Sequence, residues 1–262
     1  MQLIDTHCHL TFEPLDPDID AVIERSKAAG VISWITVGTN LPDSRKTVEF
    51  ASRFDNLYAA VGIHPHDAKD AALDTLTQLR DLAQNIKVVA IGEMGLDFHY
   101  NFSKQPDQLR VFAAQLQLAA ELNLPVIIHS RNAFDETIDV LDRFAKSVKN
   151  IVFHCFSGSP EQAKQVLDRG HYISFTGVVT FKNADRARQA ADLVPLERLM
   201  LETNSPYMSP EPVRKQKINE PALMTHTAKF LADLKKIPLE GFAAAVTATS
   251  KAFFNLPPVP IA

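Results

Sequence analysis

Short apolar runs alternate with longer helical patterns along the chain, and this alternation restricts the fold more than any other feature. Eight runs have the length and composition of buried strands: residues 3–6, 32–37, 57–61, 88–91, 126–128, 151–153, 172–175 and 198–201. Apolar residues recur at helical spacing between these runs, as in residues 108–122 and 133–144. The pattern predicts an α/β fold, a single-domain (β/α)8 barrel over residues 1–262. An open doubly wound sheet would show the same alternation and is the alternative.

The composition is that of an ordinary soluble globular protein, with 46% hydrophobic and 22% charged residues. No apolar run approaches the ~20 residues that cross a bilayer, and the N-terminus lacks the features of a signal peptide. The two cysteines, Cys8 and Cys155, cannot form a disulfide framework, so we expect a cytoplasmic protein. A net charge of −4 does not indicate general attraction to nucleic acid, but a local metal site can still hold a polyanion.

Potential metal ligands stand at the ends of five predicted strands. They are His7, His9, Glu93, His129, His154 and Asn204. In a barrel the carboxyl ends of all strands open on the same mouth, where we expect the active site. The two-residue period of a strand puts His7 and His9 on one face and turns Cys8 away. The same alternation turns Cys155 away from His154, so we expect both cysteines to be buried packing residues.

A lone histidine is more often a packing or surface residue, and we keep that interpretation for His171 and His226. The ordered set of strand-end ligands is much harder to attribute to chance. Four imidazoles and one carboxylate are enough for two divalent ions, with Glu93 as the bridging group. Nitrogen and oxygen donors suit zinc, manganese or magnesium, and the residues do not decide between them.

The chain resembles the TatD family of metal-dependent deoxyribonucleases in motifs that cover nearly the whole sequence. The motifs are I-D-T-H-C-H-L at residues 4–10, V-G-I-H-P-H at 61–66, I-G-E-M-G-L-D-F at 91–98, I-H-S-R at 128–131, F-H-C-F-S-G at 153–158, L-E-T-N-S-P-Y at 201–207 and N-E-P at 219–221. The resemblance implies that His7, His9 and Glu93 hold one ion. It implies that Glu93, His129 and His154 hold the second. It also implies hydrolysis of phosphodiester bonds in single-stranded or frayed DNA, by an exonuclease that acts from the 3′ end.

Further residues are expected to contact the substrate. The resemblance favours His64 for this role, while His66 caps the loop. Arg131, two residues beyond His129, is placed to donate hydrogen bonds to the phosphate, although it could equally begin the following helix as a solvated side chain. We expect DNA as the partner of a monomeric protein that has no obligate protein partner and no membrane association.

Asn204 stands where the family has aspartate. The resemblance implies that this acid contacts the first ion and takes a proton from the attacking water. An amide oxygen can still bind a metal, but the amide cannot accept the proton as a carboxylate does. General-base catalysis contributes ~10²–10⁴-fold, so we expect a strongly reduced activity. Glu202 lies two residues earlier on the same strand face, and its shifted position argues against it as a substitute base. A natural variant and a deliberate replacement of aspartate are equally compatible with the sequence.

The prediction is therefore a two-metal deoxyribonuclease, a hydrolase of ester bonds, with Glu93 and Asn204 as the catalytic positions. Two other functions stay compatible with the sequence. One keeps the metal site and hydrolyses a small ester or amide. The other is a metal-bound nucleic-acid-binding protein of weak catalytic activity, which only Asn204 supports.

Overall fold

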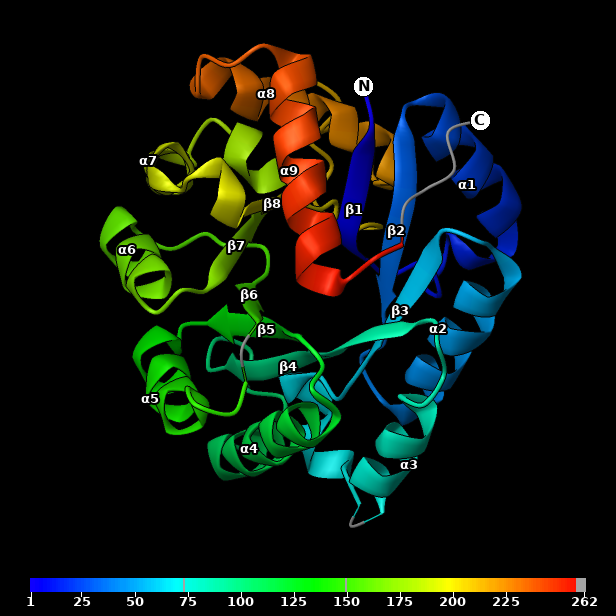
Figure 1. Ribbon diagram of the computed structural model, residues 1–262, viewed down its shortest axis with the longest axis vertical. Coiled ribbons are helices and arrows are strands. Elements are labelled where there is room, and N and C mark those ends of the chain that lie inside the picture. Colours follow the sequence, from blue (N-terminus) through cyan, green and yellow to red (C-terminus); the bar gives the residue numbers. More distant parts are fainter. Residues whose placement is uncertain (73, 149, 258–262) are drawn as a thin grey trace. The chain divides into compact units, whose positions relative to one another are not determined.

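The computed structural model describes residues 1–72, 74–148 and 150–257 (Figure 1). Its strands form one parallel sheet whose order follows the chain: β1 (Leu3–Cys8), β2 (Val31–Val37), β3 (Leu57–Val61), β4 (Val88–Asp97), β5 (Val126–Arg131), β6 (Ile151–Phe153), β7 (Tyr172–Phe175) and β8 (Leu199–Leu201). The α-helices of the described residues are α1 (Ile19–Ala28), α2 (Leu41–Arg53), α3 (Thr75–Leu82), α4 (Gln105–Leu122), α5 (Phe134–Phe144), α6 (Pro160–Asp168), α7 (Asp185–Leu193), α8 (Met224–Leu234) and α9 (Leu239–Phe254). This sequential order is that of a (β/α)8 barrel and not of a doubly wound sheet, which confirms the predicted fold class.

Strand β4 is longer than its apolar run. The sequence predicts a strand that ends at Ile91, whereas β4 continues, fully buried, to Asp97. Glycine and glutamate are poor strand formers, which is why the pattern stops early. Gly95 permits the extension because its backbone has a φ of 141°, and a Cβ there would collide with the carbonyl oxygen of His129 in β5. The extra residues bring Glu93 and Asp97 into the strand.

Contacts divide the chain into two compact units, and the first contains Met1–Thr36 and the described residues from His154 onward. Within this unit β1 lies beside β8, where Thr6 Oγ1 donates a hydrogen bond to the carbonyl of Leu201 (2.9 Å). Helix α9 packs against both strands and buries Phe242, Val246 and Phe253 (Figure 1). Apolar burial of this kind is the main force that holds a helix on a sheet.

The second unit contains Val37–Phe153, with β3 to β6 and α2 to α5. Helix α4 packs against β4 and buries apolar side chains such as Phe112 and Leu116 (Figure 1).

Helix α4 also carries two fully buried glutamines. Gln115 accepts a hydrogen bond from the N–H of Ile63 (2.7 Å) and donates one to its carbonyl (3.0 Å). Gln108 pairs with the N–H (2.8 Å) and carbonyl (3.1 Å) of Asp97 in the same way. Both strand ends are therefore fixed by polar contacts from α4.

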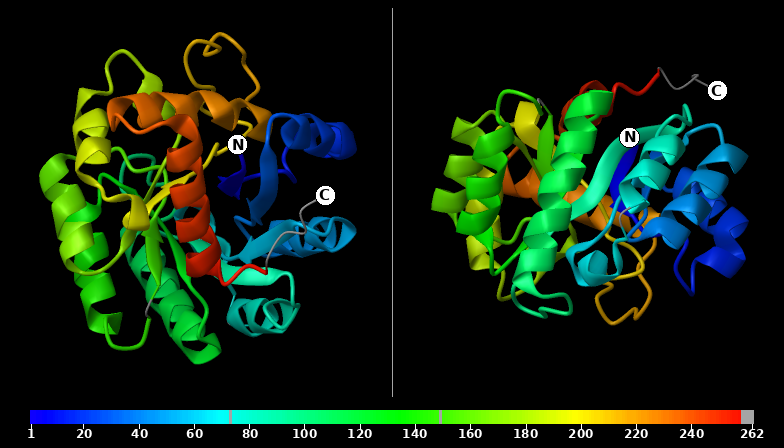
Figure 2. Two further views of the ribbon diagram at one scale, coloured as in Figure 1. Left: turned by 45° about the horizontal axis from the view of Figure 1, so that its top comes forward. Right: turned by 90° about the horizontal axis from the view of Figure 1, so that it is seen from below.

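A long segment, residues 202–220, joins β8 to the turn that precedes α8 and contains three prolines, with Pro221 next to it. Figure 2 shows this segment in gold. Asn219 closes it by donating hydrogen bonds to the carbonyls of Thr203 (3.0 Å) and Tyr207 (2.6 Å). Among the described residues, no helix combines the length and the apolar character that crossing a membrane requires.

Candidate metal centre

The first unit brings three histidines together at the ends of β1 and β6. The Nε2 atoms of His7 and His9 lie 3.2 Å apart, as two ligands of one ion do. The ring of His154 stacks on that of His7, with centroids 4.0 Å apart and planes 8° apart. Cys8 turns away as predicted, and its Sγ lies 3.4 Å from the carbonyl of Ile35 in β2.

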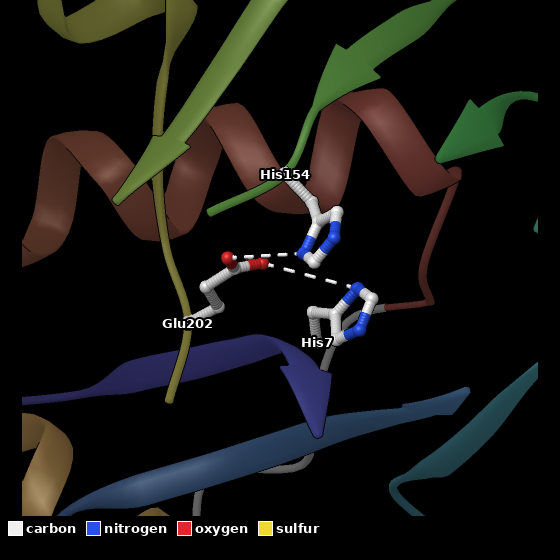
Figure 3. A group of neighbouring side chains, drawn as sticks. All are labelled: His7, His154 and Glu202. Carbon is white, nitrogen blue, oxygen red and sulfur yellow. Dashed lines mark ion pairs between the residues drawn. The ribbon is translucent and has the colours of Figure 1, made fainter. Parts of the chain in front are cut away.

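Glu202 lies beside two of these rings, those of His7 and His154 (Figure 3). Its buried carboxylate reaches Nδ1 of His154 at 3.4 Å and Nδ1 of His7 at 4.0 Å. Burial acts to raise the pKa of Glu202, but the His154 and His7 rings and a hydrogen bond from the Cys155 N–H (2.5 Å) outweigh it and lower the pKa. The carboxylate thus faces Nδ1 of both rings and leaves Nε2 of both to a metal, the usual arrangement of an oriented histidine ligand. We expect Glu202 to position the two imidazoles, and its carboxylate could also join His7 and His154 in holding an ion.

Asn204 is joined to this group through its backbone. The residue is buried, has a left-handed φ of 52°, and donates its N–H to the carbonyl of His7 (2.9 Å). Its amide nitrogen lies 3.6 Å from the sulfur of Met208. Within the described part of the chain, its buried Oδ1 accepts no hydrogen bond. A buried acceptor without a donor is rare in proteins, and a cation would satisfy it. The residues of this unit therefore fit a divalent ion.

Asp5 holds Thr203 and His7 by hydrogen bonds and was not predicted as a site residue. Its fully buried carboxylate accepts hydrogen bonds from the Thr203 hydroxyl (2.6 Å), the Thr203 N–H (3.0 Å) and the His7 N–H (3.3 Å). Burial raises the pKa of Asp5 to about 7. The sequence signal was its place two residues before His7, on the same face of the strand.

The second unit holds another group of donors, formed by His64 after β3, Glu93 in β4 and His129 in β5. Glu93 Oε1 lies 2.7 Å from His129 Nδ1 and 3.5 Å from His64 Nε2. One donor atom from each residue lies within 4.8 Å of the others, so the three could hold an ion. Burial lowers the pKa of His64 to about 4, which keeps its imidazole neutral at physiological pH and able to bind a cation or accept a hydrogen bond.

Asp97 connects this group to the loop that follows β4, and sequence reasoning missed it. Its Oδ2 lies 3.0 Å from His66 Nε2 and 3.1 Å from His129 Nε2. Its Oδ1 accepts hydrogen bonds from the N–H groups of His99 (3.0 Å) and Tyr100 (2.9 Å). Burial acts to raise the pKa of Asp97, but these hydrogen bonds outweigh it and the net pKa is well below the usual range. The missed signal is its spacing of four residues from Glu93, which puts both on one strand face.

Three other expectations have mixed outcomes. Cys155 is only half-buried, contrary to the prediction, because β6 ends at Phe153 and strand alternation does not reach the cysteine. Arg131 is the last residue of β5, not the start of α5, and its exposed guanidinium lies 4.6 Å from the ring centroid of Tyr100. Its role in phosphate binding stays a prediction. His66 does more than cap a loop, since it contacts Asp97.

We expect Asp97→Asn to lower the metal affinity by roughly 10–100-fold, as loss of a carboxylate that orients a metal-binding histidine typically does. The amide cannot accept hydrogen bonds from two rings and two N–H groups as the carboxylate does. Titration of the protein with Mn²⁺ or Zn²⁺ measures the effect. Asp139→Asn, on the exposed face of α5, is the matched control, and equal affinities of the two variants would contradict the role of Asp97.

Comparison with known proteins agrees with this geometry. A family model described as TatD related DNase matches residues 4–255. The chain belongs to the TatD-related DNase family. It is 39% identical to a metal-dependent hydrolase of Bacillus subtilis, YabD, over 97% of this chain and 99% of the relative. It is 38% identical to the 3′-5′ ssDNA/RNA exonuclease TatD of Cronobacter sakazakii, over 88% of this chain and 89% of that protein.

Solved structures of the TatD family give the same result. The TatD homolog YJJV of Escherichia coli K12 superposes with a TM-score of 0.90 at 33% identity, over 97% of this chain and 98% of the homolog. A TatD family hydrolase of Entamoeba histolytica gives a TM-score of 0.89 at 25% identity, over 97% of this chain and 98% of the other. These likenesses confirm the barrel fold. Membership of the TatD-related DNase family makes the chain a hydrolase that acts on ester bonds.

Proposed function

We propose that the protein is a metal-dependent exonuclease that hydrolyses phosphodiester bonds of single-stranded DNA from the 3′ end. The observation that carries the proposal is the convergence of imidazole and carboxylate donors at strand ends, as in the 3.2 Å approach of His7 and His9 and the 2.7 Å approach of Glu93 and His129. The names of the TatD relatives, which specify 3′-5′ exonucleases of ssDNA and RNA, support the substrate and the polarity. When bound, divalent ions would stabilise negative charge on the phosphate and lower the pKa of water.

The proposed ligand sets are those that the family resemblance implies. His7, His9 and Glu93 bind one ion, to which Asn204 adds its amide oxygen. Glu93, His129 and His154 bind the other. The barrel fold supports this assignment, because the carboxyl ends of its strands open on one face. The ions are Mg²⁺, Mn²⁺ or Zn²⁺, and the buried Asn204 Oδ1 is the feature of this chain that most directly fits a cation.

The residues around the ions bind and orient the phosphate. Arg131 donates hydrogen bonds to the non-bridging oxygens, on which charge increases in the transition state. His64, neutral because burial lowers its pKa, contacts the substrate from the end of β3. Asn204 cannot take the proton of the attacking water, so hydrolysis is slower than an aspartate at this position would allow. We further propose that residues 1–262 form one domain, which acts as a monomer in the cytoplasm.

Incubation with a 5′-labelled single-stranded oligonucleotide tests the function. We expect the label to remain on progressively shorter products when Mg²⁺, Mn²⁺ or Zn²⁺ is present, and on the intact oligonucleotide when EDTA removes the metal. A blunt duplex of the same sequence should be shortened more slowly. Absence of cleavage with every metal, by this chain and by Asn204→Asp alike, would refute the nuclease assignment. Hydrolysis of small esters or amides by the same preparation would then favour the alternative two-metal hydrolase.

A further inference from the structure

Two aromatic side chains are exposed to solvent in the segment that joins β4 to α4. Tyr100 is 48% exposed and Phe102 is 59% exposed. Their rings lie in a stacked arrangement, with centroids 5.4 Å apart and planes 12° apart. Asn101, between them, has a left-handed φ of 55°, a conformation that asparagine tolerates better than most residues. Large exposed apolar groups that lie together mark interaction sites more often than isolated ones do.

The pair is connected to the candidate metal ligands by continuous contacts. The ring of His66 meets Phe102 edge-to-face at 4.8 Å and Tyr100 at 5.5 Å. The same His66 contacts Asp97, which contacts the ligand His129. The guanidinium of Arg131 lies over the Tyr100 ring. The exposed aromatic pair thus stands beside both a cation that suits phosphate and the group that includes Glu93.

Hydrogen bonds hold the segment on both sides of the pair. Asp97 accepts the N–H of Tyr100 (2.9 Å). Ser103, directly after Phe102, donates its hydroxyl to the carbonyl of His66 (2.7 Å), and its own carbonyl accepts a hydrogen bond from Gln108 (2.8 Å). The rings are therefore held in place before any ligand arrives, which reduces the entropy lost on binding.

We propose that the Tyr100–Phe102 pair is a stacking site for an unpaired base of single-stranded DNA whose phosphate lies at the metal centre. This inference rests on the proposed function. An exposed aromatic face next to a cationic side chain is the usual design for binding single strands, because every base has a π-face and stacking tolerates any sequence. The paired bases of a duplex cannot reach such a site without unstacking, so the pair favours single strands.

Phe102→Ala tests the proposal because the side chain is mostly exposed and its loss leaves the fold intact. We expect the variant to bind a labelled single-stranded oligonucleotide roughly 5–150-fold more weakly, the range that loss of one base–aromatic stack gives. Binding is measured by fluorescence anisotropy with metal present, on an oligonucleotide whose phosphorothioate linkages resist cleavage. With metal present, KM should rise more than kcat falls. Phe102→Trp should keep the parental affinity, and Tyr100→Ala should weaken binding as Phe102→Ala does.

A second probe isolates the base from the backbone. In an oligonucleotide of equal length, abasic residues replace the nucleotides of the 3′-terminal half. We expect Phe102→Ala to lower the affinity for the normal strand and to leave the affinity for the abasic strand unchanged. Ile86→Ala removes another exposed apolar side chain, 93% exposed and before the start of β4, and should not change either affinity.

The outcomes separate this inference from the proposed function. If the parental chain cleaves single-stranded DNA and Phe102→Ala changes neither affinity nor KM, the stacking site is refuted and the nuclease stands. Equal losses for normal and abasic strands would also refute base stacking. If the parental chain neither binds nor cleaves single-stranded DNA, the proposed function fails and this inference fails with it.

Discussion

Asn204→Asp is expected to raise the rate of single-stranded DNA hydrolysis by roughly 10²–10⁴-fold, the usual contribution of a general base. The site accepts the change without rearrangement. Aspartate has nearly the same shape and tolerates the left-handed φ of 52° as asparagine does. Among the described residues, the amide nitrogen that would be lost contacts the Met208 sulfur at 3.6 Å, a weak interaction. The buried Oδ1 has no donor to lose in the described structure.

The added charge has a second expected effect. Next to the buried Glu202 and Asp5, a further carboxylate should destabilise the metal-free protein and strengthen its binding of divalent ions. Thermal unfolding with EDTA and with Mn²⁺ measures both. Asn255→Asp is the matched control, since Asn255 is exposed and has the same left-handed conformation at φ 51°. A rate for Asn204→Asp equal to that of the parental chain would show that this position does not supply the base.

Glu202→Gln is expected to weaken metal binding by roughly 10–100-fold. The charged oxygens now face Nδ1 of His7 and His154, and an amide would replace one of them with a hydrogen-bond donor. The two rings would then lose the partner that fixes their orientation, and the buried charge that favours a bound cation would be removed.

The dependence on metal concentration identifies the role of Glu202. If Glu202 positions metal ligands, excess metal should offset its loss and restore most of the activity of Glu202→Gln. If Glu202 is a substitute base, excess metal should not restore the activity, because kcat would stay low in saturating metal. Glu240→Gln, at an exposed site in the first turn of α9, controls for the loss of one negative charge. An unchanged metal affinity together with a lowered kcat would contradict the positioning role.

The strands and the shared face of His7 and His9 were predictable because both follow from local periodicity. Leu57–Val61 and Ile151–Phe153 match the predicted bounds, and His7 and His9 share a face as a two-residue period requires. The extension of β4 was not predictable from periodicity, since Gly95 is favourable there only because the backbone of His129 passes so close.

The positioning residues were missed for a related reason. Asp97 and Glu202 are isolated acidic residues, and in the sequence each could be a metal ligand or a loop residue. Their roles depend on which nitrogen of which histidine ring the carboxylate faces. That relation is a property of the fold, because it joins β4 to β5 and β8 to β1. Asp5 was overlooked because a buried carboxylate within an apolar strand is interpretable only when its partner, Thr203, is known.

The contact between β1 and β8 also determines when, during translation, the residues around His7 can meet their partners. Asp5 and His7 are among the first residues to leave the ribosome, yet their partners Thr203 and Asn204 follow almost two hundred residues later. Until then the carboxylate of Asp5 lacks the Thr203 hydroxyl that donates a hydrogen bond to it, and His7 lacks Glu202 as the partner of its Nδ1. The metal group of the first unit can therefore be complete only near the end of translation, after residues 202–204 have been synthesised.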